Sequence, residues 1–217
     1  MRCLFYGLAL TVCAHLCRLA LCWWREVLRL DLEQLWEWNK AAEPWIHIYA
    51  DARGSPPRIA AVMFRDGSKS FCDCEPPEKL LRQFKSRSDQ QIMGLEMLSL
   101  ALALSSFAPW IQGRRVILWS DNTGAETAAR EGTAKQFDHT CLAHCLWSKL
   151  AQLKTEAFIR RVPSEFNVAD LPSRGEYQLL QEIGASRVKA RLDPMFWRLG
   201  AWESLRVVSQ LASTSVG

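Results

Sequence analysis

The sequence lacks several features that would assign a chain to a structural class at once. It contains no internal repeat and no low-complexity tract, which argues against a solenoid and against a disordered chain. It also has no Cys-x-x-Cys pair, the spacing typical of structural zinc sites. What remains is a globular composition, because 49% of the 217 residues are hydrophobic and 23% are charged. A formal net charge of +4 permits a polyanionic partner without requiring one.

No clean membrane span is present in the apolar opening of the chain, residues 1–24. His15 and Arg18 divide it before 18 apolar residues accumulate, although a span remains one interpretation. Arg2 followed by apolar residues is also compatible with a signal peptide. We favour a helical N-terminal extension over residues 1–43 that packs on the domain or is the remnant of a preceding one. This interpretation predicts no stable membrane association and an intracellular location in cytoplasm or nucleus, with a signal peptide or membrane anchor at 1–24 left open.

The eight cysteines are clustered, unlike the spread of a disulfide framework in a small secreted protein. Two pairs lie in the body of the chain, and two histidines accompany the second pair: Cys72 and Cys74, Cys141 and Cys145, His139 and His144. A zinc site is one interpretation of this grouping. We prefer buried, reduced cysteines that behave as small apolar side chains.

A short apolar run, residues 116–119, is followed directly by Ser120, Asp121 and Asn122. An apolar run closed by turn-forming residues is typical of a buried strand. Asp121 is therefore expected at the carboxyl end of that strand, where open α/β sheets place their ligand sites. A carboxylate buried there requires a positive partner. The alternative is that Asp121 merely caps the helix that begins near Asn122.

The other elements are predicted from apolar periodicity and turn signals. Strands are expected at residues 45–51, 59–64 and 69–74, as an antiparallel meander, and at 114–121 and 156–162. Helices are expected at residues 88–107, 122–130, 137–153 and 170–183, the last interrupted by Pro172. The long helix has one anomaly, Glu96, whose same-face neighbours are almost all apolar, so its carboxylate should face the core. The alternative is a glutamate at the solvent edge of the apolar stripe.

Four acids thus occupy comparable places in the predicted elements. Asp51 and Asp121 end strands, Glu96 lies within a helix, and Asp170 begins one. If they converge at one edge of the sheet, they form a pocket lined by oxygen, which suits Mg²⁺ or Mn²⁺ and not zinc. Two such ions can bind the attacking and the leaving oxygen of a phosphodiester. The ions would also offset the repulsion among the carboxylates.

Four short motifs that carry these acids resemble the ribonuclease H domain, particularly that of retroelement reverse transcriptases. They are Tyr49-Ala50-Asp51-Ala52, Gly94-Leu95-Glu96, Ser120-Asp121-Asn122 and Asn167-Val168-Ala169-Asp170-Leu171-Pro172-Ser173-Arg174. The resemblance covers residues 44–183 and implies an α/β ribonuclease H-like fold. Its sheet would be mixed and five-stranded, an antiparallel three-strand meander plus parallel strands, with flanking helices. Residues 184–217 are then predicted to be a C-terminal helical tail.

The resemblance implies a metal-dependent endonuclease that cleaves the RNA strand of RNA–DNA hybrids and derives from a retroelement reverse transcriptase. Its catalytic and metal-binding acids correspond to Asp51, Glu96, Asp121 and Asp170, with two Mg²⁺ or Mn²⁺ ions as cofactors. Candidate substrate-binding residues are Asn122, Asn167 and Arg174. The two amides either contact the substrate or support the acids, and Arg174 either contacts phosphate or pairs with an acid. The implied partners are the hybrid itself and a reverse transcriptase domain on another chain.

The chain departs from the pattern of this family in two respects. Residues 162–170 contain no histidine, although many ribonucleases H carry one just before the last acid. A basic protrusion between the middle helices is also absent, so substrate affinity is expected to depend on a neighbouring polymerase domain. Three alternatives follow: a catalytically silent domain that binds nucleic acid or a polymerase partner, a nuclease of the transposase or integrase type, and a membrane-associated protein.

Overall fold

The computed structural model describes residues 43–82, 84, 91–194 and 196, together with Leu21, Trp24 and Arg25. Most of the predicted N-terminal extension, the start of the predicted helix at 88–107, and the chain after 196 lie outside these residues. Within the described part, no helix combines the length and the apolar character that a bilayer span requires.

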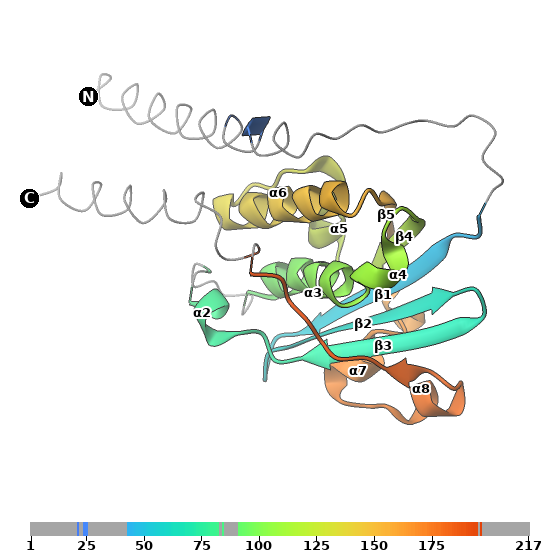
Figure 1. Cartoon of the computed structure of the whole chain (residues 1–217). Helices are drawn as coiled ribbons and strands as arrows, with labels where there is room; N and C mark the ends of the chain where they lie inside the picture. The colour runs from blue at the N-terminus through green and yellow to red at the C-terminus, as the bar shows by residue number, and fades with distance from the viewer. Residues whose placement is uncertain are drawn as a thin grey trace, which may run out of the picture.

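A single mixed sheet of six strands forms the centre of the molecule, in the order β5-β4-β1-β2-β3-β6 (Figure 1). The strands are β1 (Ile46–Arg53), β2 (Arg58–Arg65), β3 (Ser68–Cys74), β4 (Arg115–Ser120), β5 (Glu156–Arg161) and β6 (Ser186–Arg187). The first three form the expected antiparallel meander, whereas β4 pairs with β1, β5 with β4, and β6 with β3 in parallel. The α/β class and the mixed sheet are confirmed, and the arrangement is compatible with the ribonuclease H-like fold that the sequence predicted.

Two helical layers cover the sheet, one on each face (Figure 1). The larger layer contains α3 (Ile92–Ser106), α5 (Thr123–Glu131) and α6 (Phe137–Gln152), and the smaller contains α7 (Asp170–Arg174) and α8 (Gln178–Glu182). Two one-turn helices, α2 (Glu78–Leu81) and α4 (Ala108–Ile111), and a 3-10 turn, η1 (Ser164–Phe166), complete the described elements.

Helix α3 lies at the centre of the larger layer, between the sheet and α6. Every residue from Gly94 to Ser106 is buried, as expected for a helix that is apolar on all sides. Gly94 allows a close approach, because a Cβ there would come 3.1 Å from the ring of Phe84. Any charged side chain on α3 is therefore held inside the protein, which is the situation of Glu96.

The sixth strand differs from the five-stranded prediction and from the predicted helical tail. Ser186 and Arg187 pair with β3, and residues after them run back along α3. There the backbone N–H of Arg191 donates to Ser106 at 2.9 Å, and Lys149 pairs with Asp193 at 2.6 Å. Residues 184–193 are therefore part of the domain and not a helical appendage, because backbone pairing and side-chain contacts hold them against it.

The helix predicted at 170–183 is interrupted, but not at Pro172. It breaks after Arg174, where Gly175 adopts a φ of +82° and ends α7. Proline lacks only a backbone donor, and the N–H groups of the first helical turn have no partner within the helix. Pro172 is therefore tolerated inside α7, and the left-handed glycine ends the helix.

The four cysteines of the described part are free thiols. Cys72, Cys141 and Cys145 are buried and Cys74 is half-buried. Burial raises the pKa of the Cys72 thiol to about 12 and that of Cys74 to about 11. Within the described residues, no cysteine joins a group of side chains close enough to share a metal ion. Three of these four thiols therefore behave as buried, apolar-like side chains, and the first four cysteines lie outside the described residues.

Candidate metal centre

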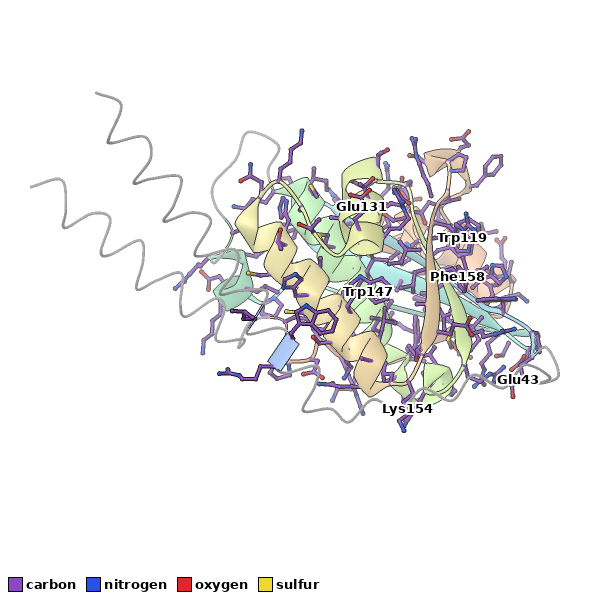
Figure 2. All side chains as sticks on the ribbon, turned by 90° about the horizontal axis from the view of Figure 1, so that it is seen from above. Glu43, Trp119, Glu131, Trp147, Lys154 and Phe158 are labelled. Carbon is purple, nitrogen blue, oxygen red and sulfur yellow. The ribbon has the colours of Figure 1, made fainter. Side chains whose placement is uncertain are left out.

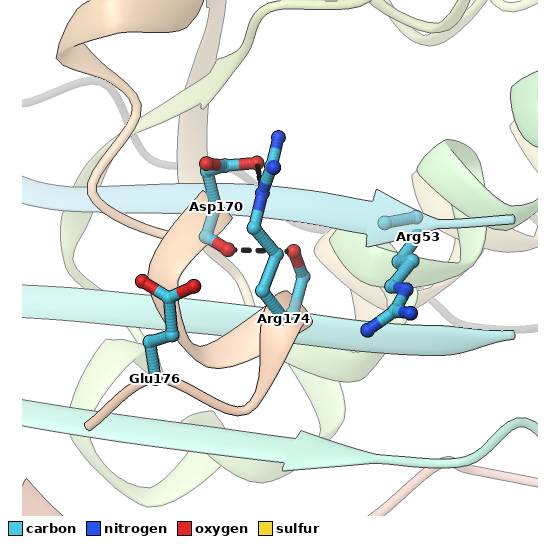
Figure 3. A pocket seen from close by; sticks show the side chains of 6 residues that line it. Arg53, Asp170, Arg174 and Glu176 are labelled. Carbon is cyan, nitrogen blue, oxygen red and sulfur yellow. Dashed lines mark hydrogen bonds and ion pairs between the residues drawn. The ribbon is translucent and has the colours of Figure 1, made fainter. Parts of the chain in front are cut away.

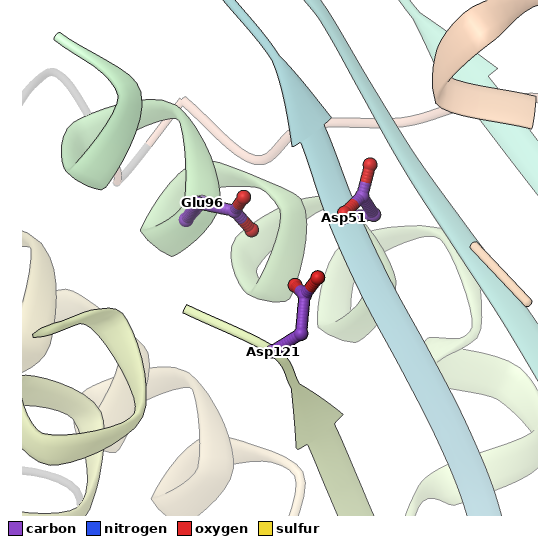
Figure 4. Close-up of side chains that lie close together, drawn as sticks. All are labelled: Asp51, Glu96 and Asp121. Carbon is purple, nitrogen blue, oxygen red and sulfur yellow. The ribbon is translucent and has the colours of Figure 1, made fainter. Parts of the chain in front are cut away.

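Three of the four predicted acids meet at one point of the molecule, at the carboxyl ends of β1 and β4 (Figure 4). Asp51, Glu96 and Asp121 each offer a carboxylate oxygen, and these oxygens all lie within 4.8 Å of one another. The acids come from three elements that are distant in the sequence, namely β1, α3 and the end of β4. The convergence is therefore a product of the fold.

The parallel register of β1 and β4 places the two aspartates side by side. Tyr49 pairs with Trp119 across these strands, so two residues further on Asp51 and Asp121 reach the same level. Parallel strands end at the same edge of a sheet, where α/β proteins commonly bind their ligands. Ser120 is fully buried, and Asp121 emerges directly after it at the start of the next turn.

Glu96 enters the site from α3, which covers β1 and β2. Its side chain is 5% exposed, and Oε2 has no hydrogen-bond partner. The backbone N–H of Ala52 donates a hydrogen bond to the carboxyl group. A buried carboxylate oxygen without a partner is costly, and this one lies beside two further carboxylates in a group that could hold a cation.

Burial and mutual repulsion favour the protonated, neutral forms of Asp51 and Glu96 when no cation is bound. The pKa of Glu96 is raised to about 10, mainly by burial and additionally by the negative charges of Asp51, Asp121 and Asp170. Burial raises the pKa of Asp51 to about 7, with added repulsion from Asp121 and Asp170, while a hydrogen bond from Ser173 and the charge of Arg174 oppose the rise. A divalent cation would favour the ionised forms of both groups.

Asn167 connects the two aspartates. Its Nδ2 donates to Asp121 Oδ1 at 3.1 Å, to the Ala50 carbonyl at 3.1 Å, and more weakly to Asp51 Oδ1 at 3.4 Å. Its Oδ1 accepts from the Ala169 N–H at 3.2 Å, which fixes the orientation of the amide. Of the two roles expected for Asn167, the structure shows the contact with the acids, since the residue is buried and orients their carboxylates.

Asp170 lies beside this group and not within it. Its Oδ1 accepts a hydrogen bond from Arg174 Nε at 2.7 Å (Figure 3). Asp170 is nevertheless near enough to raise the pKa of both Asp51 and Glu96. The structure thus brings Asp170 to the edge of the site, and its role as a metal ligand stays a prediction. For Arg174, the pairing with an acid is the arrangement observed.

A hollow of about 430 Å³ opens next to the acids, lined by Ala52, Arg53, Asp170, Ser173, Arg174 and Glu176. Figure 3 shows Arg174 next to Asp170, with Arg53 set apart from this pair. The lining therefore contains two guanidinium groups and the two carboxylates of Asp170 and Glu176.

Asn122 has the helix-capping role that was the alternative considered for Asp121. Its Oδ1 accepts from the Ala125 N–H at 2.9 Å, so Asn122 is the N-cap of α5. The alternative in which Asp121 merely caps this helix is therefore wrong. The same turn favours glycine at position 124, because a Cβ there would approach Met93 Sδ to 3.1 Å and Asn122 Oδ1 to 3.3 Å.

Three contributors to the site were missed by the sequence analysis: Ser173, Arg53 and the backbone N–H of Ala52. Ser173 follows Asp170 by three residues, and on a helix residues at this spacing share a face. Arg53 lies two residues after Asp51 on the same strand, hence on the same side of it. Both spacings were available signals, whereas no sequence pattern indicates the Ala52 amide.

The donor set fits a hard divalent cation. All of its side-chain donors are carboxylate oxygens, which Mg²⁺ and Mn²⁺ prefer, and within the described residues no histidine or cysteine belongs to the group. No protein-family model matches the chain, and a search of the curated proteins finds no match. The assignment of function therefore depends on the residues and the geometry of this site.

Proposed function

We propose that the protein is a metal-dependent endonuclease of the ribonuclease H type, which hydrolyses the RNA strand of RNA–DNA hybrids. The observation that carries this proposal is the meeting of Asp51, Glu96 and Asp121 at the ends of adjacent parallel strands. Within the described part of the chain, no arginine or lysine forms an ion pair with any of the three. Their charges are therefore left for cations that the protein binds.

The acids would hold one or two Mg²⁺ or Mn²⁺ ions, with Asp170 as a fourth candidate ligand. When bound, such ions activate water and stabilise the charge of a phosphodiester in hydrolysis. Asn167 keeps Asp51 and Asp121 in place through its amide donors, which supports ligand geometry. Arg174 and Arg53 are positioned in the adjoining hollow to contact the backbone phosphates of the substrate.

The choice of substrate is supported by the four acid-bearing motifs, which resemble those of reverse transcriptase ribonucleases H. In a hybrid, 2′-hydroxyl groups mark the RNA strand, so a protein can distinguish that strand from DNA. A retroelement origin, a reverse transcriptase domain on another chain as partner, and an intracellular location are inferences from the same resemblance. They depend on the substrate assignment.

A non-catalytic, nucleic-acid-binding domain is the second candidate. The ion pair between Asp170 and Arg174 favours it, because this pair draws one predicted ligand away from the other three. Residues 162–170 also supply no histidine for proton transfer. The two candidates agree on hybrid binding and differ only in cleavage.

The deciding experiment uses the full chain and a duplex of labelled RNA with DNA, incubated with Mg²⁺, with Mn²⁺ or with a chelator. We expect metal-dependent cleavage of the RNA strand and none of double-stranded DNA. Binding to the hybrid without cleavage under all conditions would select the non-catalytic alternative. Equal cleavage of hybrid and double-stranded DNA would instead favour a nuclease of the transposase type.

A further inference from the structure

Strand β5 forms one outer edge of the sheet, and β6 forms the other. β6 has two residues, whereas β5 has six. An edge strand presents a row of unpaired backbone groups, and proteins usually keep such edges short or cover them. β5 is therefore the edge of the described sheet at which a further strand can pair.

The backbone groups at the free edge of β5 can be identified from its pairing with β4. Glu156 N–H donates to the Arg114 carbonyl and Val162 N–H to the Ser120 carbonyl, at 3.1 Å each. The backbone N–H and C=O groups of the even-numbered residues of β5 thus point toward β4. Because this orientation alternates along a strand, Ala157, Ile159 and Arg161 turn theirs toward the free edge.

The side chains of β5 on the face opposite α3 follow a charge–aromatic–charge order. Glu156, Phe158 and Arg160 lie on this face, since they pair in register with Arg115, Ile117 and Trp119 of β4. Phe158 is 42% exposed and touches the ring of Trp45, with ring centroids 5.0 Å apart. Figure 2 shows Phe158 on β5, with Trp147 on α6 to one side.

We propose that β5 pairs antiparallel with β5 of a second copy of this chain, with Phe158 opposite Phe158 at the twofold axis. In this register Glu156 of each copy lies opposite Arg160 of the other, on the same face of a continuous sheet. Ala157 of each copy lies opposite Ile159 of the other, and these two residues exchange backbone hydrogen bonds. This agrees with the outward direction of their N–H and C=O groups. Glu156 then lies between Arg160 of the second copy and its own Arg115, which it contacts at 2.9 Å.

Neighbouring registers are less favourable. A shift of one residue would pair backbone groups that face β4 with groups that face outward. A shift of two residues in one direction places Arg160 opposite Phe158 and leaves Glu156 opposite Val162. The same shift in the other direction places Arg160 opposite Lys154, and like charges directly opposite each other are destabilising. Only the register centred on Phe158 matches opposite charges twice.

Among the described residues, a hollow of about 280 Å³ adjoins β5 and leaves space beside the strand. It is lined by Arg130, Trp147 and the strand residues 157–160. Trp147 is fixed there, because its Nε1 donates to the Ala129 carbonyl at 2.7 Å. An interface of this kind is isologous, since each copy contributes the same surface. A dimer with closed symmetry is therefore expected, and not a filament.

Disulfide formation tests the register in the full chain. Paired residues at a site without mutual backbone hydrogen bonds have Cα atoms about 4.5 Å apart, within the range of a disulfide. Phe158→Cys should therefore yield a covalent dimer on oxidation, with the bond mapped by mass spectrometry to position 158 in both copies. The control is Arg160→Cys, because two copies of this position would be roughly 13 Å apart along the strands. Equal dimer yields from both variants would overturn the proposal.

Swapping the charged residues at positions 156 and 160 tests the same interface without a covalent bond. Arg160→Glu should weaken the dimer in sedimentation measurements at least tenfold, because it places two carboxylates opposite each other. Adding Glu156→Arg to that variant should restore the dimer. A wild-type chain that is monomeric at all concentrations would refute the proposal, and so would a dimer that Arg160→Glu does not weaken. Neither outcome bears on hybrid cleavage, since these residues lie outside the metal centre.

Discussion

Asp73 and the candidate metal centre both bury carboxylates, and they treat the charge in opposite ways. The Asp73 side chain is fully buried on β3, where its oxygens accept from Arg58 Nη1 at 2.5 Å, Arg187 Nη2 at 2.8 Å and the Tyr177 hydroxyl at 2.9 Å. Arg187 also lies over the Tyr177 ring, 4.9 Å from its centroid. This acid joins β2, β3, β6 and the segment before α8 through charge-assisted hydrogen bonds.

The metal centre buries two carboxylates nearly as deeply but gives them no such partners. Asp51 and Glu96 are each 5% exposed, and their neighbours are an amide, a hydroxyl, a backbone N–H and another acid. The chain is therefore able to neutralise a buried acid with arginine, and does so at Asp73. At the candidate metal centre, no arginine or lysine of the described residues forms an ion pair with the three acids, and such unmatched acids are typical of functional sites.

The largest expected effect is on activity, at Asp121. Asp121→Asn keeps the shape of the side chain and removes one negative charge, so the circular dichroism spectrum should be unchanged. Cleavage of the hybrid should fall by about two to four orders of magnitude, or about 3–5 kcal/mol of transition-state stabilisation. Glu165→Gln is the matched control, because it removes an exposed carboxylate after β5. An Asp121→Asn protein that cleaves at the wild-type rate would remove Asp121 from the catalytic set.

The next largest effect is on folding, at Asp73. Asp73→Asn leaves Arg58 and Arg187 without their shared carboxylate. Because their side chains are 30% and 56% exposed, water solvates part of the freed charge, and the cost is on the order of 2 kcal/mol. We expect a corresponding drop in the free energy of unfolding, measured with denaturant. Glu78→Gln is the control, because its pair with Arg82 is largely exposed and should cost less than about 1 kcal/mol. Equal stabilities of the two variants would contradict the assigned structural role of Asp73.

The sequence was sufficient to predict the helices and strands with a strong apolar pattern, and the acidic residues that stand in or after them. The antiparallel meander, the strand before Asp121 and the burial of Glu96 all follow from apolar runs interrupted by a polar residue. The sixth strand could not be predicted, since two residues carry no periodicity and their pairing depends on β3. Asn167 was a candidate from its motif, but spacing alone could not identify its partners, because its amide joins residues 116 and 46 positions away.

The smallest expected effect is on the stability of the metal-free protein, and it has the opposite sign to that at Asp73. Glu96→Gln keeps an oxygen for the Ala52 N–H and replaces an acid beside Asp51 and Asp121 by an amide that donates to them. Without metal at alkaline pH, the variant should therefore be more stable than the wild type by on the order of 1 kcal/mol. This corresponds to about 2–4 °C in Tm for a protein of this size. A chelator must be present, because bound metal would stabilise the wild type preferentially.

The pH dependence of folding stability separates the contribution of Glu96 from that of Asp51. The folded protein holds Asp51 with a pKa of about 7, raised from 3.8, and Glu96 with a pKa of about 10, raised from 4.5. Between the two values of each group the folded state binds more protons than the unfolded state, so stability falls as the pH rises. The contribution of Asp51 is fully present below about pH 4 and lost by about 7, whereas that of Glu96 continues to fall until about 10. Glu96→Gln should abolish the decline between about pH 7 and 9 and should reduce the decline below pH 7 to the contribution of Asp51 alone, because both acids contribute there. Mg²⁺ should flatten both declines in the wild type. A wild-type Tm that does not fall between pH 7 and 10 would contradict a buried Glu96 without a cationic partner.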